Sequence, residues 1–403
     1  MEQIQIWRTH MLSKKLSAIS PSVTIGISTK VAELRRQGEN IISLSIGEPD
    51  FMTPDGAKEA AIQAIHNNKT KYDAAAGLLE LRNAICKKLK DENNLEYSPQ
   101  EIVVSSGAKH AITNTLIAML DPGDEVLIPK PYWTSYPEMV KIVGGVPIFV
   151  ETQKNNNFKL TVENLKVAVS DKTKLLFITN PSNPSGAVYT REELEPVVQF
   201  CVENNIYILA DEIYERICYL DTFTSVASLS EEAKNMTIII NGLSKSAAMT
   251  GWRLGYTACR PEIAGAIGTI QGHLVSHPST ITQWAAVEAI NSCQADTMHM
   301  VEQYKARREE AIHLFNTIDG VELVQPDGAF YLFADMSVIK DKVKFDDSFS
   351  IEICNKLLED HKLAVVPGIA FGLDDYIRLS YAADIQDVRE GISRIKTFVD
   401  GLR

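Results

Sequence analysis

The sequence predicts an α/β protein with two domains, and two observations carry that prediction. Apolar runs at 174–179 and 206–210 flank an amphipathic segment at 191–204, which is the spacing of strand–helix–strand units in a parallel sheet. Beyond residue 300, helical stretches alternate with short strands, which is typical of a smaller α+β domain. In order, we expect an N-terminal arm with part of the small domain at 1–45, a large domain at 46–300 and a C-terminal small domain at 301–403.

Periodicity, caps and breakers define the individual elements. We expect an irregular start at 1–26, a helix from 27 that ends at Gly38 and a strand at 41–46. In the large domain we expect helices at 54–67 and 81–89 and strands at 101–105, 125–129, 174–179, 206–210 and 237–240. Near the C-terminus we expect a helix at 300–319, strands at 321–324 and 329–333, and helices at 349–360 and from 385.

Composition and charge exclude several classes of function. Asp and Glu number 52 against 40 Lys and Arg, and the net charge of −12 argues against a nucleic-acid binder. No apolar run is long enough to predict a membrane span, and the mixed polar N-terminus lacks a signal-peptide core, so we expect a cytoplasmic protein. The six cysteines are scattered, and we interpret them as small buried residues rather than as disulfides or metal ligands.

A lysine among small residues is the first candidate for chemistry. Lys245 follows the buried strand at 237–240 and is surrounded by Gly, Ser and Ala. Poor solvation there favours the neutral amine, which can form a Schiff base with a carbonyl compound. Arg253 is a planar cation suited to a phosphate. An aldehyde and a phosphate together suggest pyridoxal 5′-phosphate, although this pair alone also fits a surface Lys and Arg.

Other candidates follow predicted strands in the same way. Ser105 to Lys109 form a small-residue turn before a helix, which is the layout of a phosphate site but a common one. Trp133 could stack on a flat ligand or belong to the core. Asn183 lies in a stiff turn with two Asn-Pro pairs, and Asp211 ends the strand at 206–210. Because ligands bind outside the carboxyl ends of parallel strands, we expect these residues to meet at one edge of the sheet.

Two further residues stay open on sequence alone. Gly47, in the turn that follows the strand at 41–46, either serves the turn or lets a ligand approach the backbone closely. Tyr72 lies in an alanine-rich loop and is either a core residue or a hydroxyl directed at a ligand.

Four motifs taken together identify a family resemblance. The stretches 180–186, 211–214, 242–255 and 376–380 occur in the order, and with the key residues, of the class I and II pyridoxal-phosphate-dependent aminotransferases of fold type I. The resemblance covers nearly the whole chain. It implies a large domain with a mostly parallel sheet sandwiched by helices, and a smaller α+β domain.

The resemblance implies roles around the cofactor. Lys245 would carry the Schiff base and later shuttle the proton between the substrate Cα and the cofactor, while Asp211 would pair with the pyridine nitrogen. Tyr214 and Asn183 would bond the phenolic oxygen, and Trp133 would stack on the ring. The residues implied at the phosphate are Gly107, Ala108, Lys109, Ser244, Arg253 and, from a neighbouring subunit, Tyr72. The last of these implies a homodimer with shared active sites, and the first twenty or so residues would drape over the partner or close the site.

The resemblance also implies the substrates, which are small amino acids and 2-oxo acids. Arg378 would hold the substrate α-carboxylate, helped by Gly47, Trp133 and Asn183. Residues 23–54 and 131–133 are most similar to the bacterial and archaeal aspartate aminotransferases, so we expect ping-pong transfer from L-aspartate to 2-oxoglutarate. Lys109 would meet the distal carboxylate of aspartate or lie beside the phosphate.

Several alternatives remain at this stage. Aromatic, alanine, kynurenine and branched-chain substrates stay open, as does a C–S lyase of the same fold. Relatives that also take prephenate tend to carry a basic residue where this chain has Ser20, which argues against that activity. A pyridoxal-phosphate-binding regulator would need an added basic DNA-binding module, for which the short N-terminus and acidic charge leave no room.

Overall fold

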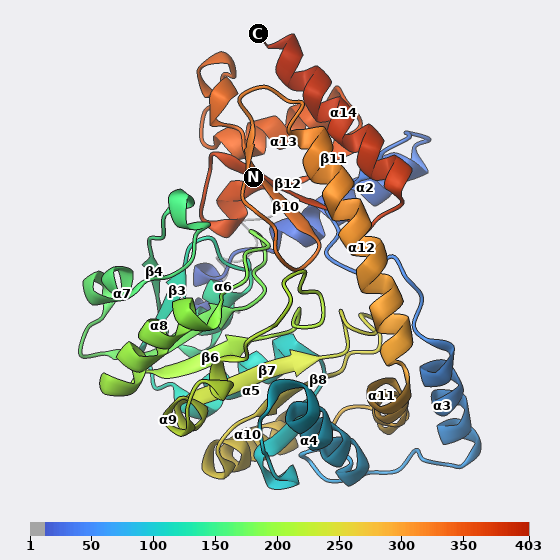
Figure 1. Ribbon diagram of the computed structural model, residues 1–403, viewed down its shortest axis with the longest axis vertical. Helices are drawn as coiled ribbons and strands as arrows, with labels where there is room; N and C mark the ends of the chain where they lie inside the picture. The colour runs from blue at the N-terminus through green and yellow to red at the C-terminus, as the bar shows by residue number, and fades with distance from the viewer. Residues whose placement is uncertain (1–12, 403) are drawn as a thin grey trace.

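A seven-stranded sheet forms the centre of the larger part of the molecule. The computed structural model describes residues 13–402 (Figure 1). The strands lie in the order β2-β8-β7-β6-β5-β3-β4. Their bounds are β2 (Ile102–Ser105), β3 (Glu125–Pro129), β4 (Val146–Val150), β5 (Thr173–Thr179), β6 (Tyr207–Asp211), β7 (Thr237–Gly242) and β8 (Gly255–Ala258).

All strands of this sheet run parallel except β8, which pairs antiparallel with both β2 and β7. The carboxyl ends of β2, β5, β6 and β7 therefore share one edge. The side chains of a strand alternate between the faces, so Val126 and Ile128 pack in one apolar core and Leu127 in another. This two-sided burial confirms the predicted mostly parallel sheet between helices.

Helices cover both faces of the large sheet. One core holds residues of α5, α6 and α10, a second holds residues of α7, α8 and α9, and a third, at the β2–β8 end, holds residues of α3, α4 and α11. Their bounds are α3 (Asp55–His66), α4 (Leu79–Asn93), α5 (Ala108–Met119), α6 (Tyr136–Val143), α7 (Val162–Ala168), α8 (Arg191–Glu203), α9 (Glu231–Met236), α10 (Pro261–Leu274) and α11 (Thr280–Ser292).

The smaller part is α+β, as predicted. A four-stranded antiparallel sheet has the order β12-β13-β10-β9, and a two-stranded parallel sheet joins β1 to β11. The elements are α2 (Val23–Arg36), β1 (Ile42–Ser43), β9 (Glu322–Leu323), β10 (Tyr331–Asp335), α13 (Phe349–Glu359), β11 (Leu363–Ala364), β12 (Val366–Pro367), β13 (Tyr376–Ser380) and α14 (Ile385–Gly401). Short 3-10 helices lie at Lys14–Ala18, Pro99–Glu101, Lys154–Asn156, Val226–Ser228, Ser337–Lys342 and Gly368–Phe371.

Helix α12 (Gln294–Phe315) joins the two parts. It begins beside α11 and ends beside α14, as Figure 1 shows in orange. Because this one helix crosses residue 300, the division into 1–45, 46–300 and 301–403 remains a prediction.

Several local predictions were wrong in extent, including the helix expected at 300–319, which spans Gln294–Phe315, and the strand expected at 321–324, which spans Glu322–Leu323. Helix α2 starts inside the segment expected to be irregular, because Ser22 is a helix cap whose hydroxyl accepts a hydrogen bond from the Ile25 N–H at 3.4 Å. The strand expected at 41–46 pairs only over Ile42–Ser43, since its partner β11 has only two residues. Strand β10 starts two residues later than expected, at Tyr331. The expected draping of the N-terminal arm falls largely on residues 1–12, outside the described part.

The described residues also show whether disulfides, clusters of metal-ligating side chains or membrane-spanning helices occur among them. All six cysteines are free, and four of them are buried. Within residues 13–402 no cluster of three or more metal-ligating side chains occurs. None of the helices described there has the length and apolar character needed to cross a bilayer.

Candidate active site

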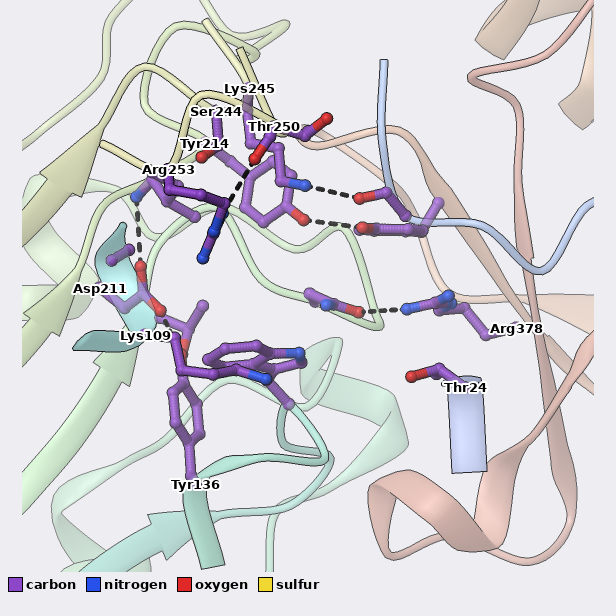
Figure 2. A pocket seen from close by; sticks show the side chains of 17 residues that line it. Thr24, Lys109, Tyr136, Asp211, Tyr214, Ser244, Lys245, Thr250, Arg253 and Arg378 are labelled. Atoms are coloured by element: carbon purple, nitrogen blue, oxygen red, sulfur yellow. Dashed lines mark hydrogen bonds between the residues drawn. The ribbon is translucent and has the colours of Figure 1, made fainter. Parts of the chain in front are cut away.

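A cavity of about 300 Å³ lies where the carboxyl ends of the large sheet face the small sheet. Every site residue predicted from the sequence lines this cavity except Tyr72 and Gly107. Figure 2 shows Asp211, Lys109 and Arg253 on one side of it, Arg378 and Thr24 on the opposite side, and Lys245 between them.

Lys245 supplies a partly buried amine to the cavity. It follows β7 by three residues, and its Nζ donates a hydrogen bond to the Gly47 carbonyl at 2.5 Å. Burial lowers the pKa of this amine to about 8, and the nearby Arg378 and Arg253 act in the same direction, while Glu48 opposes them. A substantial fraction of Lys245 is therefore neutral, and nucleophilic, near pH 8.

Asp211 is the buried carboxylate of the cavity. It is the last residue of β6, and burial raises its pKa to about 6. The Tyr136 hydroxyl donates to its Oδ2 at 2.7 Å and lies 2.8 Å from the Thr179 Oγ1. The Tyr136 ring stacks on Phe177 with centroids 4.2 Å apart. Asp211 thus stays ionised at neutral pH and has a fixed orientation.

Gly107 and Arg253 lie together at the start of α5 and make a positively charged cradle there. Gly107 has a φ of +92° and directly precedes the helix, so the first helical N–H groups face the site. A Cβ atom at Gly107 would lie 2.6 Å from the Arg253 Nη2, so only glycine lets this guanidinium approach the helix. Arg253 has a φ of +57°, a strained conformation for a side-chain-bearing residue, and its Nη1 donates to the Thr250 carbonyl at 2.9 Å.

Arg378 is the buried cation on the opposite side. It lies in the centre of β13 and is 3% exposed. Its Nη1 donates to the Asn183 Oδ1 at 3.0 Å and its Nη2 to the Ser45 carbonyl at 2.8 Å, while its Nε has no partner. A buried guanidinium with an unused donor is suited to an anionic ligand.

Lys109 and Trp133 are adjacent in the cavity. The Lys109 Nζ lies 4.9 Å from the centroid of the Trp133 ring, and burial, with a smaller effect from Arg253, lowers the pKa of Lys109. The Trp133 ring in turn meets Tyr136 edge-on at 5.3 Å. Lys109 is thus near both the cradle at the start of α5 and the Trp133 ring.

Tyr214, three residues beyond Asp211, also lines the cavity. It is buried, and burial raises its pKa well above the ordinary value, so its hydroxyl keeps its proton. That hydroxyl lies 2.7 Å from the hydroxyl of Tyr331.

Tyr72 lies outside the cavity. Its side chain is 90% exposed, and its ring meets His277 edge-on at 5.9 Å. Within one chain it contacts none of the groups described above.

Sequence reasoning missed several cavity residues. They are Thr24, Tyr136, Thr179, Ile213, Thr250 and Tyr331. Tyr136 and Tyr331 belong to the regular elements α6 and β10, where a buried tyrosine is an ordinary core residue. Thr179 carried a weak signal, because it ends a strand one residue before the Asn-Pro turn.

The fold and this site define a class of protein. The family described as aminotransferase class I and II matches residues 39–395, and the chain belongs to it. The protein is therefore an aminotransferase.

Individual relatives support the same conclusion. The chain is 44% identical, over 96% of its length and 99% of the relative's, to the aspartate aminotransferase of Bacillus sp. strain YM-2. It is 45% identical, over 96% and 98%, to the probable aspartate/prephenate aminotransferase of Aquifex aeolicus. Among solved structures, the aspartate aminotransferase of Rhizobium meliloti has a TM-score of 0.92 at 38% identity (96% and 98% covered), and that of Thermus thermophilus with maleate 0.90 at 38% (96% and 99%).

Proposed function

We propose that this protein is a pyridoxal-phosphate-dependent aminotransferase that moves the amino group of L-aspartate to 2-oxoglutarate by a ping-pong mechanism. One observation carries the proposal: a partly buried amine, with its pKa lowered to about 8, lies between a buried carboxylate and a buried arginine that has a free donor. Family membership gives the reaction class, and these three groups match what it requires.

The residues present fit pyridoxal phosphate. The cradle of Gly107, Arg253 and the start of α5 suits a phosphate, and Ala108 and Ser244 line the same side of the cavity. When bound, the cofactor supplies an electron sink for the charge left by loss of the substrate Cα proton. Asp211, ionised above pH 6, would accept the ring N–H, and Trp133 would cover one ring face. Tyr214 and Asn183 would donate to the phenolic oxygen.

Lys245 would move the proton. Near pH 8 both protonation states of its amine are populated, so Nζ can take the proton from the substrate Cα as a general base and return it as a general acid. The Gly47 carbonyl, 2.5 Å away, gives the ammonium form a hydrogen-bond acceptor.

Arg378 would orient the substrate. Its free Nε and planar guanidinium suit the α-carboxylate, and the Asn183 side chain keeps that plane fixed. A substrate held there would place its Cα near Lys245, because Lys245 lies between Arg378 and Asp211 in the cavity (Figure 2).

Lys109 supports aspartate as the substrate. It supplies a cation across the cavity from Arg378, at a place where a second carboxylate could pair with it. Relatives named aspartate aminotransferase at 41–44% identity agree with a short dicarboxylate, as does the Thermus thermophilus enzyme, whose structure was solved with maleate. The other interpretation, in which Lys109 serves the phosphate, leaves other amino-acid substrates and C–S lysis open.

A half-reaction screen tests the proposal. The protein loaded with pyridoxal phosphate is mixed with single amino acids, and the cofactor absorbance is followed without any 2-oxo acid. We expect aspartate and glutamate to bleach the band rapidly, and the matching 2-oxo acids to restore it, as a ping-pong cycle requires. Bleaching by aromatic amino acids alone would overturn the choice of aspartate, and pyruvate release from cystathionine would indicate a lyase.

We also propose a homodimer with shared active sites. Its support is Tyr72, a large aromatic side chain that is 90% exposed and contacts no cavity group of its own chain. Exposed apolar side chains of α3 and α10, such as Ile62, Ile65 and Leu274, offer surface for a second copy. Light scattering gives the mass, and Tyr72→Phe should weaken cofactor binding.

A cytoplasmic location remains a prediction that suits six free thiols.

A further inference from the structure

Tyr331 contacts both sides of the cavity and has no role in the proposed function. It is the first residue of β10, is 1% exposed and lines the cavity. Its hydroxyl lies 2.7 Å from that of Tyr214, and its ring centroid lies 4.4 Å from the Arg378 Cζ. One side chain therefore contacts a group on the cofactor side and the cation on the substrate side.

The Tyr331 hydroxyl lies close against the backbone of Gly47. A Cβ atom built on Gly47 would lie 2.6 Å from the Tyr331 Oη, but 3.5 Å from its Cζ. Gly47 does not have a positive φ, so its conformation accepts alanine and only the hydroxyl excludes it. The Gly47 carbonyl accepts the hydrogen bond from the Lys245 amine. The contact between Gly47 and Tyr331 is therefore linked, through Gly47, to the catalytic amine.

The direction of the tyrosine–tyrosine hydrogen bond follows from counting hydrogens. Each hydroxyl has one hydrogen to donate. If Tyr214 donates to the phenolic oxygen of the cofactor, the Tyr331 hydroxyl must donate to Tyr214. A hydroxyl that accepts a hydrogen bond is a stronger donor, so Tyr331 strengthens the bond that Tyr214 makes.

The ring of Tyr331 acts on Arg378 separately from its hydroxyl. A guanidinium over an aromatic face gains a favourable cation–π interaction, and in a buried site it also loses freedom to tilt. Ser45 and Asn183 hold two nitrogens of Arg378, and the ring supports its plane. The Phe371 ring also lies 5.1 Å from this Cζ, but the Tyr331 ring is nearer, so the orientation that a substrate carboxylate meets depends on the Tyr331 ring rather than on its hydroxyl.

We propose that Tyr331 is a positioning residue with two separable functions: its hydroxyl strengthens the Tyr214 hydrogen bond to the cofactor, and its ring orients Arg378 for the substrate carboxylate. The inference rests on the proposed function, since both partners take their roles from it.

Two substitutions separate the two functions. Tyr331→Phe removes the hydroxyl and keeps the ring, whereas Tyr331→Leu removes both. The hydrogen bond to the phenolic oxygen favours the more negative, high-pH form of the bound cofactor. We therefore expect Tyr331→Phe to raise the pH midpoint of the cofactor absorbance by a few tenths of a unit, with KM for aspartate within twofold of the unsubstituted enzyme. Tyr331→Leu should show the same shift and a KM raised tenfold or more.

Tyr381→Phe is the matched control. Tyr381 is 1% exposed, follows β13, and donates to the Ala329 carbonyl at 3.0 Å, but it does not line the cavity. This variant loses a buried hydroxyl of the same kind and should move neither the midpoint nor KM. An unchanged midpoint in Tyr331→Phe, a shift of equal size in Tyr381→Phe, or equal KM values in the Phe and Leu variants of Tyr331 would each overturn the proposal.

Gly47→Ala gives a second, independent test. In the unsubstituted background it forces the Tyr331 hydroxyl away and should lower kcat/KM at least tenfold. With Tyr331→Phe the nearest ring atom is 3.5 Å from the added methyl, so the double variant should be more active than Gly47→Ala alone. A double variant no better than Gly47→Ala contradicts the inference. If the unsubstituted protein has no pH-dependent cofactor band or no transamination, the proposed function fails instead.

Discussion

The two sides of the cavity differ in how they hold their charged groups. On the large-sheet side, Lys245 and Asp211 lie at strand ends, and burial moves their pKa values toward neutrality, to about 8 and about 6. On the small-sheet side, Arg378 lies in the middle of β13, opposite Phe333 of β10, where an arginine stays charged despite burial. One side is therefore suited to proton transfer and the other to binding a permanent anion.

The difference has a structural cause. A strand end leaves backbone groups and side chains free to face a ligand, whereas a side chain in a strand centre is held by ladder pairing and by its neighbours. Arg378 is fixed in this way by Ser45, Asn183 and the Tyr331 ring. Lys245, which must change its protonation state, lies in the turn after β7, whereas Arg378, which must keep its position and charge, lies in the centre of a strand.

The largest effect should come from removing the amine on the large-sheet side. Lys245→Ala should lower kcat at least about 10⁴-fold, because both the nucleophile and the proton carrier are lost. Single-turnover absorbance with aspartate measures this, and Lys305→Ala, an exposed lysine on α12, is the control. Retention of both the cofactor band and turnover by Lys245→Ala would remove the basis of the proposed function.

Removing the cation on the small-sheet side should have the next largest effect. Arg378→Ala should lower kcat/KM for aspartate about 10²- to 10³-fold, since a buried charge-assisted interaction is lost. Arg378→Lys should recover little of it, because an ammonium lacks the planar pair of donors. Steady-state kinetics should show the loss mainly in KM. A loss confined to kcat would mean that Arg378 does not bind the α-carboxylate.

Tyr136 provides a pH test of the large-sheet side. Tyr136→Phe removes a hydrogen bond that favours the Asp211 carboxylate, so the pKa of Asp211 should rise from about 6 by about one unit. The acidic limb of the pH profile of kcat/KM should move to higher pH together with this pKa. Tyr189→Phe, which removes a hydroxyl bonded to the Leu160 N–H instead, should leave that limb unchanged.

The raised pKa of Asp211 should also affect the pH dependence of the stability of the cofactor-free protein. Between 3.8 and about 6 the folded Asp211 binds more protons than the unfolded one, so this group lowers the free energy of unfolding as the pH rises through that window. In Tyr136→Phe the fall should continue to higher pH. Urea denaturation at several pH values measures it, and Asp211→Asn should abolish this contribution.

The smallest effect should come from Lys109. Lys109→Ser should lower kcat/KM for aspartate about tenfold while leaving that for alanine nearly unchanged, if Lys109 meets the distal carboxylate. Lys109→Arg, which keeps the charge, should preserve part of the preference. An equal loss for both substrates, together with weaker cofactor binding, would place Lys109 at the phosphate.

Residues in turns were found from sequence because turns carry local signals. The Ser-Gly turn at 105–107 and the Asn-Pro pairs at 180–184 mark strand ends by composition, and parallel connectivity then requires those ends to share an edge. Lys245 and Asp211 follow buried strands in the same way. Arg378 was found only by resemblance, because nothing local distinguishes it from a surface arginine.

The sequence by itself determined the α/β class, the order of the elements predicted from it and the strand ends at which chemistry can occur, because apolar periodicity and breakers are local properties of the chain. It did not predict the sheet strands β4 and β8. Only the tertiary structure decided that Tyr136 bonds Asp211 across 75 positions and that Tyr331 bonds Tyr214 across 117. Those contacts depend on the packing of α6 and β10 against strand ends far away in the chain. No local pattern records which buried tyrosine will find a partner there.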